Sequence, residues 1–158
     1  MKGRAALLAT VVFGLVLLRG APAQAQEKPG QLGLGFIAGT PLGASAKYML
    51  SRDFAADFAL GAEGGDFDMH SDLLVHLRDL LPQPQKGKLP FYLGLGFKIR
   101  TESDTFFGLR FVGGASYLVQ DQPIEFFAEI APVLRLAPSP DGDIDGGVGV
   151  RYYFGLGK

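Results

Sequence analysis

Apolar and polar residues alternate along almost the whole chain, and this period of two limits the possible folds more than any other feature. Residues 89–100 show the pattern most clearly. One set of alternate positions is apolar: Leu89, Phe91, Leu93, Leu95, Phe97 and Ile99. The other set is small or polar: Pro90, Tyr92, Gly94, Gly96, Lys98 and Arg100. Successive side chains of a β-strand point to opposite faces, so the pattern predicts a strand with one apolar and one polar face.

The alternation recurs in eight segments, near residues 32–38, 44–50, 54–60, 67–78, 89–100, 107–117, 125–135 and 147–154. Turn-forming residues separate them at 39–41, 51–53, 64–66, 82–87, 102–104, 121–123 and 138–142. Residues 72–81 also suit a helix, because their leucines share a helical face. We assign them to a strand because the alternation continues into them. The whole pattern predicts an all-β protein.

The first 25 residues have the order of an export signal. Lys2 and Arg4 give a basic start, residues 5–18 are apolar, and small residues up to Ala25 form a cleavage site. We therefore predict a signal peptide at 1–25 and one barrel domain at 26–158. A retained membrane anchor is the alternative, but the apolar run is shorter than the ~20 residues that a spanning helix needs.

Composition narrows the classes of protein further. Residues 1–25 contain Lys2, Arg4 and Arg19 and no acid, so the remainder has 12 basic and 16 acidic residues. This acidic balance argues against nucleic acid as a partner, which would require a basic patch. The chain has no cysteine, so no disulfide can hold an exported domain together.

The two faces of the segments together indicate a membrane. The apolar faces are too continuous for a surface in water, and the opposite faces carry too many charges for the core of a soluble protein. A barrel with lipid outside and a polar lumen inside accounts for both the apolar and the charged faces. Eight tilted strands of ~10 residues can span an outer membrane. We therefore predict a closed, antiparallel, up-and-down transmembrane barrel in the bacterial outer membrane.

Aromatic residues and one hairpin give this barrel an orientation and a register. With both termini in the periplasm, two aromatic groups lie near the two membrane interfaces, as such residues favour. The periplasmic group is Tyr48, Phe54, Phe91, Tyr117, Phe126, Tyr152 and Phe154, and the outer group is Phe36, Phe67, Phe97 and Phe107. A three-residue turn at 51–53 places Lys47 opposite Asp57 on the inner face.

Five stretches carry a resemblance across nearly all of the chain after residue 25. They are KYMLS at 47–51, DFALG at 57–61, KGKLPFY at 86–92, EIAPVL at 129–134 and GGVGVRYYF at 146–154. These stretches resemble a family of uncharacterised small bacterial outer-membrane β-barrel proteins with an OmpA/OmpX-like fold. The resemblance implies the barrel and its location but no molecular role, because the family's role is itself unassigned.

The last segment also resembles the C-terminal signal that the outer-membrane assembly machinery recognises. Gly149, Tyr152 and Phe154 match the glycine and the two aromatic positions of that signal. The tail 155–158 departs from it, because such signals usually end at the final aromatic residue. The resemblance implies the assembly machinery as a partner.

The charged residues of the inner faces are the candidate functional residues. They are Lys47, Asp57, Asp72, Arg78, Lys98, Arg100, Arg110, Glu125, Glu129, Arg135 and Arg151. An eight-stranded interior is narrow, so these charges must pair or stay partly hydrated. We expect a lumen closed by salt bridges. The excess of bases over acids in this set motivates the alternative of a narrow polar pore or an anion site.

No metal, cofactor or catalytic residue is expected. His70 and His76 are about 20 Å apart along a strand, which is too far to share a metal ion. Residues 141–146 open like a calcium loop, but the twelfth position is Tyr152 where a glutamate is needed. No G-x-S-x-G, H-E-x-x-H or P-loop motif occurs.

These observations favour a non-enzymatic integral outer-membrane protein that acts as a structural or surface-interaction scaffold. Its expected contacts are membrane lipid and lipopolysaccharide, without nucleic acid. The polar pore remains one alternative. A soluble, lipocalin-like binding barrel in the periplasm is another, and it would turn the apolar faces inward around a ligand.

Overall fold

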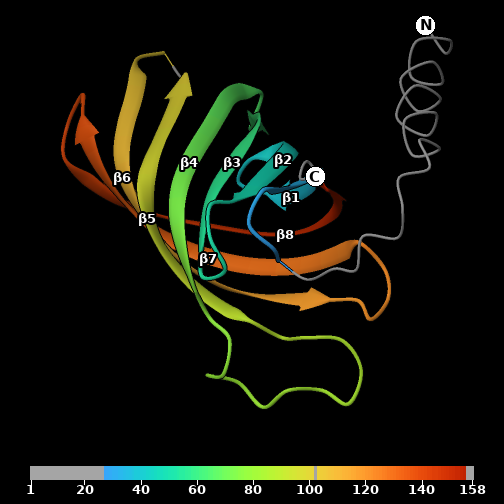
Figure 1. The fold of residues 1–158 in the computed structure, drawn as a ribbon. Helices are drawn as coiled ribbons and strands as arrows, with labels where there is room; N and C mark the ends of the chain where they lie inside the picture. Colours follow the sequence, from blue (N-terminus) through green and yellow to red (C-terminus); the bar gives the residue numbers. More distant parts are fainter. Residues whose placement is uncertain (1–26, 102, 156–158) are drawn as a thin grey trace, which may run out of the picture.

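The computed structural model describes residues 27–101 and 103–155, which form a closed barrel of eight strands (Figure 1). The strands are β1 (Gln31–Gly39), β2 (Leu42–Met49), β3 (Phe54–Glu63), β4 (Asp66–Leu77), β5 (Phe91–Thr101), β6 (Thr105–Leu118), β7 (Ile124–Ala137) and β8 (Asp141–Gly155). Each strand pairs antiparallel with the next, and β8 pairs with β1. The predicted all-β, up-and-down barrel is confirmed.

Two sequence predictions lie outside the described residues. These are the signal peptide at 1–25 and the end of the C-terminal tail, 156–158. Within the described part of the chain, no helix is long and apolar enough to cross a membrane.

The β2–β3 hairpin has the register predicted from its short turn. Lys47 lies opposite Asp57, and Tyr48 lies opposite Ala56. The Ser51 hydroxyl accepts the amide N–H of Phe54 at 3.1 Å, which closes the turn. Because side chains alternate with a period of two, this register places both charged residues on the inner face.

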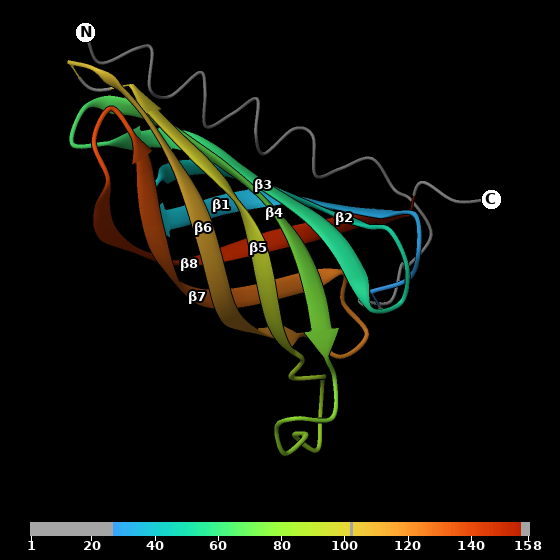
Figure 2. The ribbon, with the colours of Figure 1, turned by 90° about the vertical axis from the view of Figure 1, so that its left-hand side faces the viewer.

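Connections at the two ends of the barrel differ in length. We call the end with Gln31 and Gly155 the termini end and the opposite one the far end. Every connection at the far end spans two or three residues. At the termini end, residues 78–90 join β4 to β5 and extend beyond the barrel wall (Figure 2).

Two boundaries differ from the prediction at this long connection. The predicted strand at 72–81 ends at Leu77, and the strand expected from Leu89 begins at Phe91. The Gln83 side chain explains the second difference, because its Oε1 accepts the Leu89 N–H at 3.0 Å. Its Nε2 donates to the Arg78 and Leu81 carbonyls, both at 2.9 Å. Gln83 thus takes hydrogen bonds that a neighbouring strand would otherwise make.

The barrel is inverted relative to a water-soluble globule. Large apolar side chains such as Phe111 and Ile130, 49% and 60% exposed, cover the outside, while Lys47, Lys98 and Arg110 are 0% exposed inside. Soluble proteins rarely bury lysine and arginine fully, and rarely expose wide apolar surfaces. The lipocalin-like alternative requires the opposite arrangement, so its premise is wrong.

The lumen also contains apolar side chains that the charge pattern did not predict. Two buried clusters lie among the charges. One comprises Met49, Ala55, Leu74, Tyr92, Val112, Leu118, Ala131 and Tyr153, and the other Ile37, Ala59 and Phe127. Glycines make room for the rings: a Cβ on Gly149 would collide with the Phe127 ring, and one on Gly114 with Tyr92. The interior is therefore a packed core of mixed polarity.

Candidate functional site

The candidate site is a ladder of ion pairs along the lumen. At the termini end, the carboxylate of Glu27, just before β1, gathers three partners. It accepts from Lys47 Nζ at 2.8 Å and from Arg78 Nη1 at 2.9 Å, and His76 Nε2 lies 3.1 Å away. Burial raises the Glu27 pKa, but Lys47 and His76 outweigh burial and hold that pKa well below its ordinary range. Glu27 thus closes the base of the lumen as a carboxylate.

Glu125 on β7 forms the next level. It accepts from Lys47 Nζ at 2.9 Å, from the Tyr153 hydroxyl at 2.8 Å and from Arg151 Nη1 at 3.4 Å. The Ser116 hydroxyl also donates to it. A buried carboxylate is tolerable only when its lone pairs are filled, and four donors from β2, β6 and β8 fill them here.

Two arginines occupy the middle of the barrel. Arg151 Nη2 lies 2.7 Å from Asp57, and its Nε donates to the Ser45 hydroxyl at 2.9 Å. Arg110 donates to Asp72 and, at 2.7 Å, to Glu129. These contacts join β2, β3, β4, β6, β7 and β8 across the lumen. Each arginine therefore links strands that are not neighbours in the sheet.

Lys98 dominates the level nearer the far end. Its Nζ lies 2.7 Å from Asp145, 3.0 Å from Asp68 and 3.3 Å from Glu63. Arg100 continues the ladder outward, with Nη1 3.0 Å from Glu63. Three carboxylates from β3, β4 and β8 thus converge on one ammonium from β5.

Aromatic rings complete the packing of the cations. The Arg151 guanidinium lies 3.8 Å from the centroid of the Phe127 ring, and that of Arg135 lies 4.3 Å from Phe106. Such cation–π contacts are strongest where water is excluded. The rings and ion pairs together leave the central cations fully enclosed.

The predicted lumen residues divide into a centre and two mouths. Lys47, Asp57, Asp72, Lys98, Arg110, Glu125 and Arg151 are buried, and the Glu129 side chain is 2% exposed. Arg78, Arg100 and Arg135 lie at the mouths and are only partly buried. The structure thus brings most of the predicted set into one network and separates three bases from its centre.

The expected excess of bases is wrong for the enclosed part of the lumen. Among the described residues, the buried bases are Lys47, Lys98, Arg110 and Arg151. The buried acids are Glu27, Asp57, Asp68, Asp72, Glu125 and Asp145, and the side chain of Glu129 is enclosed with them. The balance reverses for two reasons. Three predicted bases lie at the mouths, and three acids were not counted in the predicted set. The enclosed lumen therefore lacks the excess of bases that suggested an anion site.

Two of the three uncounted acids came from segments interpreted as something other than lumen wall. Glu27 precedes the first strand, and Asp145 belonged to the segment that resembles a calcium loop. That segment is strand: β8 begins at Asp141, and Asp145 pairs with Ala131 of β7. Asp68 could have been included from the sequence, because it alternates with Phe67 and Met69.

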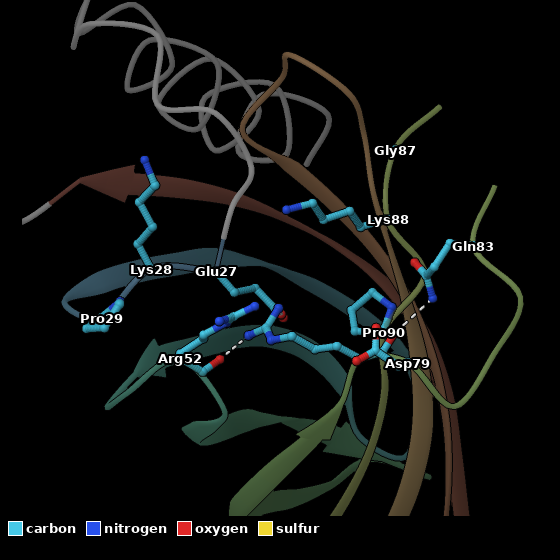
Figure 3. Close-up of a pocket in the computed structure, with 10 residues that line it drawn as sticks. Glu27, Lys28, Pro29, Arg52, Asp79, Gln83, Gly87, Lys88 and Pro90 are labelled. Carbon is cyan, nitrogen blue, oxygen red and sulfur yellow. Dashed lines mark hydrogen bonds and ion pairs between the residues drawn. The ribbon is translucent and has the colours of Figure 1, made fainter. Parts of the chain in front are cut away.

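A pocket of about 580 Å³ opens at the termini end, above Glu27 (Figure 3). Residues before β1 line one side and the 78–90 connection lines the other. Its charged residues are Glu27, Lys28, Arg52, Arg78, Asp79 and Lys88. Arg78 joins the pocket to the ladder, because it contacts Glu27 and, at 3.2 Å, Asp53.

The residues of the resembled assembly signal lie on the last strand. Tyr152 and Phe154 face outward, with ring centroids 4.9 Å apart, whereas Gly149 faces inward against Phe127. Pairing of β8 with β1 makes this strand the closing element of the barrel. Their recognition by assembly machinery remains a prediction.

Comparisons with known proteins bear on the fold. No protein-family model matches the sequence, and no curated protein does. Among solved structures, the chain is similar to the N-terminal β-barrel domain of Pseudomonas aeruginosa OprF, with a TM-score of 0.56 and 17% identity. The match covers 80% of this chain and 98% of that domain. The OmpA-like barrel fold is confirmed. At this identity the likeness concerns the fold alone, so function must be argued from this chain's own residues.

Proposed function

We propose that this protein is an integral outer-membrane β-barrel that acts as a closed, non-enzymatic scaffold. The observation that carries the proposal is the inversion of the barrel, with apolar side chains outside and a salt-bridged interior. Hydrocarbon is the surrounding that suits such an exterior. The similarity to the OprF barrel domain supports the same assignment.

The distribution of aromatic residues supports a membrane of defined thickness. Tyr48 and Phe54 are exposed toward the termini end, and Phe67 is exposed toward the far end. Between them the outer face carries aliphatic residues such as Leu95 and Leu73, 54% and 53% exposed. Phe36 and Phe126 do not separate in this way, because both lie opposite Val150 in the register. Two aromatic girdles around an apolar band are typical of outer-membrane barrels.

The filled lumen favours a scaffold over a pore. Lys47, Lys98 and Arg110 are fully buried and each contacts at least two carboxylates. A conducting path at these levels would have to break several ion pairs at once. In this proposal, membrane lipid and lipopolysaccharide surround the outer face of the barrel. The assembly machinery recognises Gly149, Tyr152 and Phe154 on the last strand.

Cysteine labelling tests the membrane assignment, and the absence of native cysteine makes every introduced thiol unique. Leu93→Cys and Phe111→Cys place a thiol on the outer wall, and Gln122→Cys places one in the exposed β6–β7 turn. In membranes, we expect a water-soluble maleimide to label only Gln122→Cys, and all three variants to react after denaturation. Rapid labelling of Leu93→Cys and Phe111→Cys, together with recovery in the soluble fraction, would reject the proposal.

A further inference from the structure

Two buried carboxylates and one histidine share the inner face of the β3–β4 pair. Asp57 lies directly opposite Asp72 in the register, and His70 lies two residues before Asp72 on the same strand. All three side chains point into the lumen, at 0–3% exposure. Like charges directly opposite on a sheet destabilise it, so this arrangement requires something positive between or beside the two carboxylates.

Ligand-type atoms of these residues converge. One oxygen of each aspartate and one ring nitrogen of His70 all lie within 4.8 Å of one another. Neither His70 nitrogen has a hydrogen-bond partner in the structure, and neither does Asp72 Oδ1. Buried polar atoms are normally satisfied, so a fully buried imidazole with two unpartnered nitrogens needs an explanation.

The nearby cations pair with the two carboxylates but leave both His70 nitrogens without a hydrogen-bond partner. Arg151 contacts Asp57, Arg110 contacts Asp72, and Lys98 approaches from β5, where it lies opposite His70 in the register. Each of these three cations has other carboxylate partners: Glu125 for Arg151, Glu129 for Arg110, and Asp145 for Lys98. The six buried acids and the enclosed Glu129 side chain outnumber the four buried bases, and Arg78 from the mouth offsets only one of these acids, at Glu27. The enclosed lumen therefore retains an excess of carboxylates.

We propose that Asp57, His70 and Asp72 form a buried site for a divalent transition-metal ion of the zinc class. One imidazole nitrogen and two carboxylate oxygens are ligands that zinc accepts, and a tetrahedral site with three protein ligands leaves one position open. Ligand atoms around one tetrahedral zinc are about 3.4 Å apart, so small side-chain rotations close the observed spacing. The histidine distinguishes the site from those of Mg²⁺ and Ca²⁺, which prefer oxygen ligands.

The metal would replace the missing partner of His70 and separate the two aspartates. It would also join the side chains of β3 and β4 in the middle of the lumen, where Arg151 and Arg110 already connect these two strands to β6, β7 and β8. The site depends only on the barrel interior. A failed test of the metal site would therefore leave the membrane assignment unaffected, and a failed membrane assignment would leave the metal site unaffected.

Metal content of the purified barrel tests the proposal. The protein is folded in detergent with excess Zn²⁺, dialysed, and analysed for bound metal, alongside His70→Gln, Asp72→Asn and the matched control His76→Gln. His76 is the other buried lumen histidine, and its nearest carboxylate is Glu27, outside the site. We expect one zinc per chain in the wild type and in His76→Gln, and at least a tenfold loss in the other two.

A spectroscopic variant covers the case in which His70→Gln or Asp72→Asn fails to fold. The chain has no cysteine, so His70→Cys introduces a single thiol. With Co²⁺ in place of zinc, a thiolate ligand at position 70 gives an intense charge-transfer band that the wild type lacks. Absence of stoichiometric zinc from the folded wild type would overturn the proposal. Equal zinc in His70→Gln, or no cobalt–thiolate band in folded His70→Cys, would do the same.

Discussion

The ammonium of Lys98 on β5 and the carboxylate of Asp145 on β8 meet at 2.7 Å inside the barrel, although their strands are not neighbours in the sheet. The pair crosses the lumen, so it braces walls that backbone hydrogen bonds do not join. Its neighbours Asp68 and Glu63 make the same ammonium the centre of a three-carboxylate cluster. Such an arrangement makes the interior sensitive to the loss of a single charge.

Lys98→Met is expected to destabilise the barrel strongly. The change leaves Asp68 and Asp145 buried without their ammonium, and removing one partner of a buried ion pair costs about 3–5 kcal/mol. Urea unfolding in lipid vesicles, followed by the heat-modifiable shift on gels, measures the loss. Arg100→Met is the control, because Arg100 lies at the mouth with a side chain 15% exposed. A loss for Lys98→Met no greater than for the control would contradict the prediction.

Glu27→Gln should destabilise the termini end by about 3 kcal/mol at pH 7, because Lys47 and Arg78 lose their shared carboxylate. The Glu27 pKa in the folded protein lies below its ordinary value of 4.5. Its stabilisation is therefore complete above that value and is lost only as pH falls through the lower folded pKa. Unfolding measured from pH 7 to pH 3 checks this. The wild type should keep its advantage down to about pH 5, and an advantage that appears only at acidic pH would oppose the prediction.

Phe111→Arg tests the outer wall energetically. A charged residue on the lipid face near the bilayer midplane costs about 2–4 kcal/mol, whereas the same charge in water costs little. We expect Phe111→Arg to lower folding stability in vesicles by this amount and Gln122→Arg to leave it unchanged. Equal stability of the two variants would indicate that water surrounds Phe111.

Gly149→Ala should destabilise the barrel by about 1–3 kcal/mol, the usual cost of an extra group in a packed interior. A Cβ at this position would meet the Phe127 ring and the Phe36 carbonyl. Gly142→Ala is the matched control on the same strand, because no atom lies within 4 Å of its added Cβ. Combining Gly149→Ala with Phe127→Leu, which removes the ring, should recover part of the loss. Thermal unfolding of Gly149→Ala, Gly142→Ala, Phe127→Leu and the double variant measures the pattern.

The strand order and the faces of the barrel could be predicted because they depend on local rules. Alternation fixes which face each residue occupies, and a short turn fixes the register of Lys47 with Asp57. Ion-pair partners could not be predicted in the same way. Lys47 lies opposite Asp57, yet its ion pairs are with Glu27 and Glu125, because only barrel closure determines which side chains meet across the lumen.

The convergence of Asp57, His70 and Asp72 illustrates the same limit. The distance between His70 and His76 along their strand excludes a metal ion shared by the two histidines. The sequence does not show that Asp57, on the preceding strand, lies close to His70, because the β3–β4 register that sets Asp57 opposite Asp72 forms only in the folded barrel. The position of Arg135 shows the same limit. It lies near the mouth, where the β6–β7 register is irregular, and alternation along the sequence does not reveal such an irregularity.

The tight connections at the far end have a consequence for how such a barrel would meet the outside of a cell. In the proposed orientation, with both termini directed to the periplasm, the hairpin bends of two or three residues and the outermost residues of the long strands β6, β7 and β8 would reach the external surface. Any recognition there would depend on a small, rigid ring of side chains around the rim. The one extended connection, residues 78–90, would face inward, toward the cell wall.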